Sequence, residues 1–199
     1  MRRSPAPTTC GRARARSWRS ARRGSVASDP AGRDGGRAEG GPLAGVHVGI
    51  VLSERDEASA RLADAAERWL RGEGAGVSRH AAPAAFEVAQ LAGWLADSGR
   101  VDGIVACASI VKGETSHDRH LAEAVTTGLL EIGVRTRIPV GNAVLTVDSP
   151  EQADARSGGA RGNRGEDAAR AVAGLLRARK RLGGRPALDL GPVSAPRGG

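Results

Sequence analysis

The stretch VDGIVACASIVKGETSH, residues 101–117, decides the fold class of this 199-residue chain. Up to Val111 it consists of branched apolar residues with small residues between them, which is typical of a buried strand. Gly113 breaks the strand, and Thr115 or Ser116 can cap a helix that begins directly afterwards. The stretch therefore predicts a strand, a turn and a helix in immediate succession.

Strands and helices alternate along the chain on both sides of this stretch. The order predicts an α/β fold of the flavodoxin-like type, a three-layer αβα sandwich with a four-stranded parallel sheet. We expect strands over residues 46–52, 77–81 (weak by composition), 101–111 and 138–145, helices over residues 57–71, 86–96, 116–132 and 166–181, a helix start at Ser149-Pro150, and a glycine-rich loop over residues 158–165.

The net charge of +8 is concentrated at the two ends of the chain. Residues 1–44 are rich in Arg, Gly, Ser and Pro and lack apolar periodicity, so we expect a disordered basic extension there. We expect the folded domain over residues 45–182 and a second disordered tail over residues 183–199. Residues 1–28 also have the composition of a transit peptide, which is the less favoured alternative.

Three features of the sequence limit the possible partners and the cellular compartment. Basic tails can bind nucleic acid nonspecifically, but a folded recognition motif and interleaved aromatic residues are missing, so we expect no specific nucleic-acid partner. No apolar run approaches the roughly 20 residues of a membrane helix, so we expect no membrane partner. Cys10 and Cys107 do not make a disulfide framework, which favours a reducing cytoplasm.

Ligands bind at the carboxyl ends of the strands in such sheets, so the turns at residues 53–56, 82–87 and 109–117 are candidate sites. In the last of these, the amides of a helix start favour an anion, and Gly113 permits its close approach. His117 can then shuttle protons beside that anion. The alternative is an ordinary capped turn with a solvent-facing histidine.

Two further motifs suit a polar ligand. Residues 83–87 form a turn into a helix whose amides and acidic residue can bind a polar heterocycle, unless Phe86 is simply a core anchor. Arg156 precedes the glycine-rich loop and can hold a phosphate with a charge-assisted fork, unless it is a solvated surface residue. His117 and His120 lie on one face of a helix, but no third ligand has suitable spacing, so we expect no metal.

The motifs of these candidate sites follow one another in a specific order. In chain order they are Phe86-Glu87, Lys112-Gly113-Glu114-Thr115-Ser116-His117, Pro139-Val140, Val144-Leu145-Thr146, Glu151-Gln152-Ala153, Arg156 and Gly162-Asn163-Arg164-Gly165. This order and spacing resemble the lumazine synthase family of riboflavin biosynthesis. The resemblance covers residues 46–176, nearly the whole expected domain.

The resemblance implies an enzyme, a transferase of the penultimate step of riboflavin biosynthesis. The family condenses 5-amino-6-(D-ribitylamino)uracil with 3,4-dihydroxy-2-butanone 4-phosphate to 6,7-dimethyl-8-ribityllumazine, with release of phosphate and water and without a metal or organic cofactor. The alternative is a shell-forming homologue with lost or altered activity, which serves as a scaffold or binds flavin-related molecules.

The resemblance also implies a role for individual residues. His117 matches the proton-transfer histidine, and Arg156 matches the arginine that holds the phosphate. The other matched positions bind substrate: Glu114 and Thr115 the butanone phosphate, Ala85, Phe86 and Glu87 the ribityl-uracil, and Ser109, Ile110 and Val111 the pyrimidine.

Two matched positions carry unusual residues. The family usually has an aromatic residue at position 55 and often at position 142, where this chain has Arg55 and Asn142. A guanidinium can also stack on a heterocycle, so both remain candidate substrate-binding residues. In the family the site lies between neighbouring subunits of a pentamer, and some members form a shell of sixty subunits. The resemblance thus implies small-molecule substrates, a homo-oligomer and riboflavin synthase as a partner.

Overall fold

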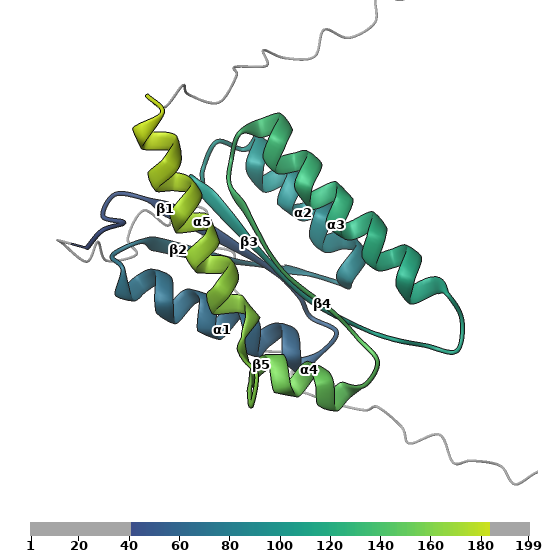
Figure 1. Cartoon of the computed structure of the whole chain (residues 1–199). Helices are drawn as coiled ribbons and strands as arrows, with labels where there is room; N and C mark the ends of the chain where they lie inside the picture. The colour runs from purple at the N-terminus through teal and green to yellow at the C-terminus, as the bar shows by residue number, and fades with distance from the viewer. Residues whose placement is uncertain (1–40, 184–199) are drawn as a thin grey trace, which may run out of the picture. The chain divides into compact units, whose positions relative to one another are not determined.

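Strands and helices alternate from His47 to Arg181 in the computed structural model, which describes residues 41–183 (Figure 1). This alternation confirms the predicted α/β class. The strands are β1 (His47–Ser53), β2 (Gly76–Ala82), β3 (Gly103–Val111), β4 (Val140–Val147), β5 (Ser157–Gly159) and β6 (Gly162–Asn163), and the helices are α1 (Glu57–Gly72), α2 (Ala85–Asp97), α3 (His117–Thr136), α4 (Pro150–Arg156) and α5 (Arg164–Arg181).

The four long strands form one parallel sheet in the order β2-β1-β3-β4. The chain runs from β1 outward to β2, returns past β1 to β3, and continues to β4. Leu52 of β1 pairs with Ala81 on one side and with Cys107 on the other. All four strands therefore end along one edge of the sheet, which we call the carboxyl edge and define by the last residue of each strand: Ser53, Ala82, Val111 and Val147.

The strand predicted with the weakest pattern, residues 77–81, is confirmed as β2. It pairs with β1 along its whole length, from Gly76 to Ala82. Its polar composition follows from its place at the edge of the sheet, where Arg79 and Ala81 are exposed. Arg79 is held against α1 by its ion pairs with Asp64 and Glu67.

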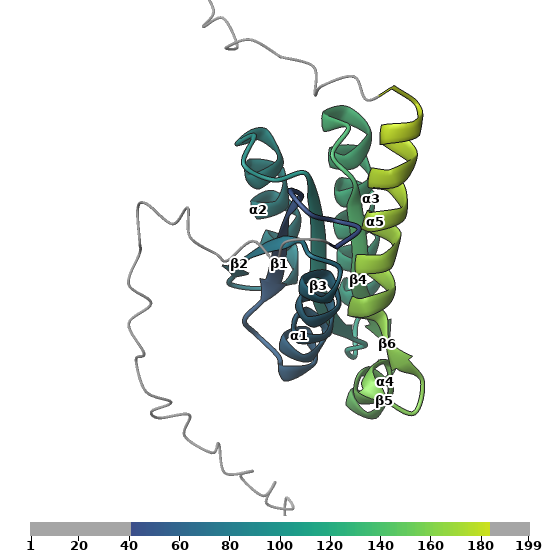
Figure 2. The same ribbon diagram turned by 90° about the vertical axis from the view of Figure 1, so that its left-hand side faces the viewer.

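Helices cover both faces of the sheet (Figures 1 and 2). The layer of α1 and α5 packs on one face, around a core that includes Val48, Leu62 and Val172. The layer of α2 and α3 packs on the other face, around a core that includes Val51 and Val88. Small and branched apolar residues thus build both cores of this three-layer sandwich, as the scarcity of aromatic residues requires.

Helix α5 approaches its neighbours through glycine. A Cβ atom on Gly165 would lie 1.9 Å from the carbonyl oxygen of Leu62 in α1. A Cβ atom on Gly141 of β4 would lie 2.6 Å from the carbonyl oxygen of Ala168 in α5. The backbones of these elements are therefore in direct contact, and a side chain at either glycine would push them apart.

The glycine-rich loop expected over residues 158–165 is instead a short hairpin followed directly by α5. Strands β5 and β6 pair antiparallel, and the positive φ angles of Gly158 (124°) and Gly162 (77°) allow the tight turn. Asn163 then caps α5, because its side-chain oxygen accepts a hydrogen bond from the Gly165 amide at 2.9 Å. The helix therefore begins at Arg164 rather than at residue 166.

Two other boundaries differ from the prediction. Helix α3 continues past Ile132 to Thr136, whose hydroxyl donates back to the Ile132 carbonyl at 2.7 Å. At the start, Leu43 belongs to the core, with 2% of its surface exposed, and its amide donates to the Glu73 carbonyl. The disorder expected over residues 1–40 and 184–199 lies outside the described residues.

The contact of Gly165 with α1 predicts opposite effects for two substitutions in the same helix. Gly165→Ala should lower the free energy of unfolding by about 1–3 kcal/mol, because the added methyl group overlaps the backbone of α1. Gly174→Ala should raise it by about 0.5–1 kcal/mol, because a Cβ atom there meets no atom within 4 Å. Urea unfolding of both variants measures the difference, and equal stabilisation by both would contradict the direct backbone contact.

Candidate active site

Three turns follow the carboxyl edge: the β1–α1 turn (residues 54–56), the β2–α2 turn (residues 83–84) and the β3–α3 turn (residues 112–116). In two of these turns, the first residue makes a backbone hydrogen bond to the end of a neighbouring strand. The Glu54 amide donates to the Ala82 carbonyl at 2.9 Å, and the Lys112 amide donates to the Val147 carbonyl at 2.8 Å. The strand order changes direction between β1 and β3, which is where ligands bind in open α/β sheets.

The β3–α3 turn leads into α3, whose first residue is His117. All residues from Val111 to His117 are exposed. Ser116 occupies the N-cap position, but its side chain makes no capping hydrogen bond. Instead, the hydroxyl of Thr115 accepts a hydrogen bond from the His117 amide at 3.5 Å. The amides of the first turn of this 20-residue helix give the turn a positive end. The turn can therefore bind an anion beside an exposed histidine.

The β2–α2 turn presents an apolar ring and an acid at the start of α2. Phe86 is 50% exposed, so the alternative that it is a core anchor is wrong, whereas Ala85 before it is buried. One carboxyl oxygen of Glu87 is buried and has no hydrogen-bond partner among the described residues. An unpaired buried acceptor is costly, so this oxygen suits a ligand that donates a hydrogen bond.

Strand β3 contributes a second such atom, the buried hydroxyl oxygen of Ser109, which also has no partner within the described part of the chain. Ser109 alternates with Ile110, which packs in the layer of α2 and α3, so Ser109 lies on the face covered by α1 and α5. The unpaired atoms of Glu87 and Ser109 are therefore on opposite faces of the sheet. Burial raises the pKa of the Cys107 thiol to about 12, so this thiol is not a nucleophile.

The β1–α1 turn holds Arg55 on a fixed backbone. The Arg55 amide donates to the Ser53 hydroxyl at 3.2 Å. Asp56 caps α1, because its carboxylate accepts a hydrogen bond from the Ser59 amide at 2.8 Å. The side chain of Arg55 is exposed and has no ion pair within residues 41–183, so its guanidinium is available for a ligand.

Asn142 and Arg156 belong to other elements than the three turns. Asn142 is exposed on β4, where it pairs with Ala106 well before the carboxyl edge, and its side chain accepts a hydrogen bond from the Val144 amide at 2.9 Å. Arg156 ends α4, and Ala153 of that helix packs into the core of α1 and α5. His117 belongs to α3, which covers the other face (Figure 1). Arg156 and His117 therefore belong to different layers of the chain.

Two ion pairs at the carboxyl edge were missed by the sequence analysis. Lys112 lies 3.6 Å from Asp148, which ties the β3–α3 turn to the end of β4, although both side chains are too exposed for a large gain in stability. Arg61 of α1 pairs with Asp154 and donates to the buried Ser157 hydroxyl at 3.1 Å. Arg61 thus fixes the residues on both sides of Arg156. Only its place near the start of α1, at the carboxyl edge, could have suggested this.

Residues 41–183 contain no group of three or more His, Cys, Asp or Glu side chains arranged to hold a metal ion. Within the same range, no helix has the length and apolar character needed to cross a membrane.

Comparison with known proteins gives one consistent result. The family described as 6,7-dimethyl-8-ribityllumazine synthase matches residues 45–180. The protein of that name from Xanthomonas campestris pv. campestris (strain B100) is 35% identical over 125 residues, which are 59% of this chain and 81% of the relative. The corresponding protein from Pediococcus pentosaceus is 35% identical over 123 residues, 60% of this chain and 79% of the relative. The one from Nitratidesulfovibrio vulgaris is 42% identical over 100 residues, 50% of this chain and 64% of the relative.

Proposed function

The chain belongs to the 6,7-dimethyl-8-ribityllumazine synthase family, and we propose that it is the active transferase of riboflavin biosynthesis, with its site at the carboxyl edge of the sheet. It condenses 5-amino-6-(D-ribitylamino)uracil with 3,4-dihydroxy-2-butanone 4-phosphate. The observation that carries this proposal is the family match over residues 45–180, which includes the motif residues of the turns after β2 and β3.

The chemistry needs proton transfers more than a nucleophile from the protein. The primary amine of the uracil attacks the ketone and forms an imine with loss of water. A proton leaves the neighbouring carbon as phosphate departs, and the resulting enol becomes a ketone. The ribitylamino nitrogen attacks this ketone, and a second water leaves as the ring closes. His117, exposed at the start of α3, relays protons in these steps.

The phosphate and the uracil take different parts of the site. The phosphate lies against the amides at the start of α3, near Glu114 and Thr115, because this helix end favours an anion. The ribityl hydroxyls donate to Glu87, whose buried oxygen lacks a partner in the described residues. Holding both substrates together supplies much of the acceleration, since the first step joins two molecules.

The site is completed by a second copy of the chain. Asn142 lies on β4, the outer strand of the sheet on that side, and Arg156 ends α4 in the layer of α1 and α5. We assign these two residues to the site of the neighbouring copy, where Arg156 holds the phosphate that leaves.

Exposed apolar side chains support this assembly. In the layer of α2 and α3, Trp94 is 68% exposed, Leu130 68% and Val134 73%. Leu130 and Val134 lie one helical turn apart and share a face of α3. Apolar groups gathered on one layer mark a protein contact, which we propose is the subunit interface of a homopentamer. Cytoplasmic location and a partnership with riboflavin synthase complete the proposal.

The proposed activity has a direct test. The purified full-length chain should form 6,7-dimethyl-8-ribityllumazine from the two substrates, detected by the fluorescence of the product. A chelator should leave the rate unchanged, because no residue of the described site is arranged to hold a metal. Folded, oligomeric protein that forms no product would contradict the proposal.

The role of Arg156 predicts a selective defect. Arg156→Ala should lower kcat/KM for the butanone phosphate by about 100-fold, because the leaving phosphate loses its charged donor. The dissociation constant of the ribityl-uracil should change little. The control Arg156→Lys keeps the charge but loses the fork, so its defect should be intermediate. Steady-state kinetics with each substrate varied in turn separate these outcomes, and an equal loss for both substrates would refute the assignment.

A further inference from the structure

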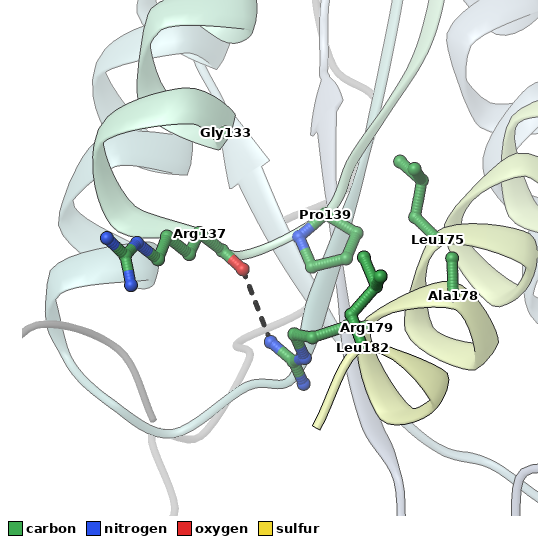
Figure 3. Close-up of a pocket in the computed structure, with 7 residues that line it drawn as sticks. All are labelled: Gly133, Arg137, Pro139, Leu175, Ala178, Arg179 and Leu182. Atoms are coloured by element: carbon green, nitrogen blue, oxygen red, sulfur yellow. Dashed lines mark hydrogen bonds between the residues drawn. The ribbon is translucent and has the colours of Figure 1, made fainter. Parts of the chain in front are cut away.

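A groove of about 420 Å³ lies at the opposite end of the sheet from the candidate site, between the end of α3, the start of β4 and the end of α5 (Figure 3). Its lining is mainly apolar. Two leucines in it are exposed to solvent, Leu175 by 52% and Leu182 by 88% of their surface. Pro139 and Ala178 complete the apolar part of the lining.

Two arginines line one side of the groove. Arg179 donates from its guanidinium to the Arg137 carbonyl at 3.3 Å, as the dashed line in Figure 3 marks. Arg179 also lies 4.0 Å from a carboxylate oxygen of Asp102, at the limit of an ion pair, and within residues 41–183 the Arg137 guanidinium has no acidic partner. An apolar segment that carries one acid therefore complements the groove.

The sequence itself supplies such a segment shortly after Leu182, which lines the groove. The tail that follows Gly183 contains Pro186-Ala187-Leu188-Asp189-Leu190, and Asp189 is the only acid between residues 184 and 199. Gly183 has a positive φ of 80°, the conformation that ends a helix and turns the chain back. Leu175 lies about 10 Å back along α5 from Leu182, whereas five extended residues span up to about 17 Å. The tail is thus long enough to reach the whole groove.

We propose that residues 186–190 dock in this groove in the same chain. Leu188 and Leu190 cover the apolar surface of Leu175, Ala178 and Leu182, while Asp189 pairs with the guanidinium of Arg137 or Arg179. The groove lies at the end of the sheet away from the candidate active site, so docking leaves the proposed transferase activity unchanged. The inference is therefore independent of the proposed function.

Disulfide trapping in the full-length chain tests this proposal. The parent variant carries Cys10→Ser, Ala178→Cys in the groove and Ala187→Cys in the tail. The native Cys107 does not interfere, because its thiol is buried and its pKa is raised to about 12. The matched control adds Leu188→Ser and Leu190→Ser, which keep the cysteines and the length of the tether and remove only the apolar anchors.

We expect the parent to form an intrachain disulfide on the order of 10-fold faster than the control, because docking raises the effective concentration of one thiol near the other. Asp189→Asn should slow the parent at low salt and have less effect in 1 M salt, where exposed charges are screened. Equal rates in parent and control would overturn the proposal. Disulfides that form only between chains, and faster at higher protein concentration, would also overturn it and identify a second copy as the occupant.

Discussion

The contact between α5 and α1 is the constraint on which the rest of the structure depends. Gly165 lets α5 begin against the carbonyl of Leu62, and Gly141 lets the same helix lie directly on β4. The residue before Leu62, Arg61, pairs with Asp154 and donates to Ser157, and its carbonyl accepts a hydrogen bond from Asn163. The start of α5, the hairpin and the end of α4 are thus all fixed to one turn of α1.

This arrangement explains why the candidate site is divided. The same contacts that order α4 also hold Arg156 in the layer of α1 and α5, whereas α3 carries His117 in the other layer. We therefore propose that a site containing both residues combines two chains, because the two residues belong to different layers of one chain. In the proposed composite site, the unpaired oxygen of Glu87 and the start of α3 at His117 form one half. In this proposal, catalysis depends on assembly.

The sequence predicted the elements whose pattern is local. The apolar run of β3 and the Ser149-Pro150 helix start are where their residue types place them. The hairpin of β5 and β6 was not predictable, because two glycines with positive φ and a cap by Asn163 look like any glycine-rich loop. The contacts of Arg61 were missed because they join residues more than ninety positions apart, which no local pattern records. The substrate-binding roles of Arg55 and Asn142 stay predictions.

The most direct test of the divided site is complementation between two inactive variants. His117→Ala and Arg156→Ala should each be nearly inactive when assembled alone. When the two variants are co-assembled in equal amounts, about a quarter of the sites in a closed ring receive both native residues, and lumazine formation should return to about a quarter of the native rate. Mixed oligomers that remain as inactive as the two parents would contradict the account, because they would place both residues in the site of a single chain.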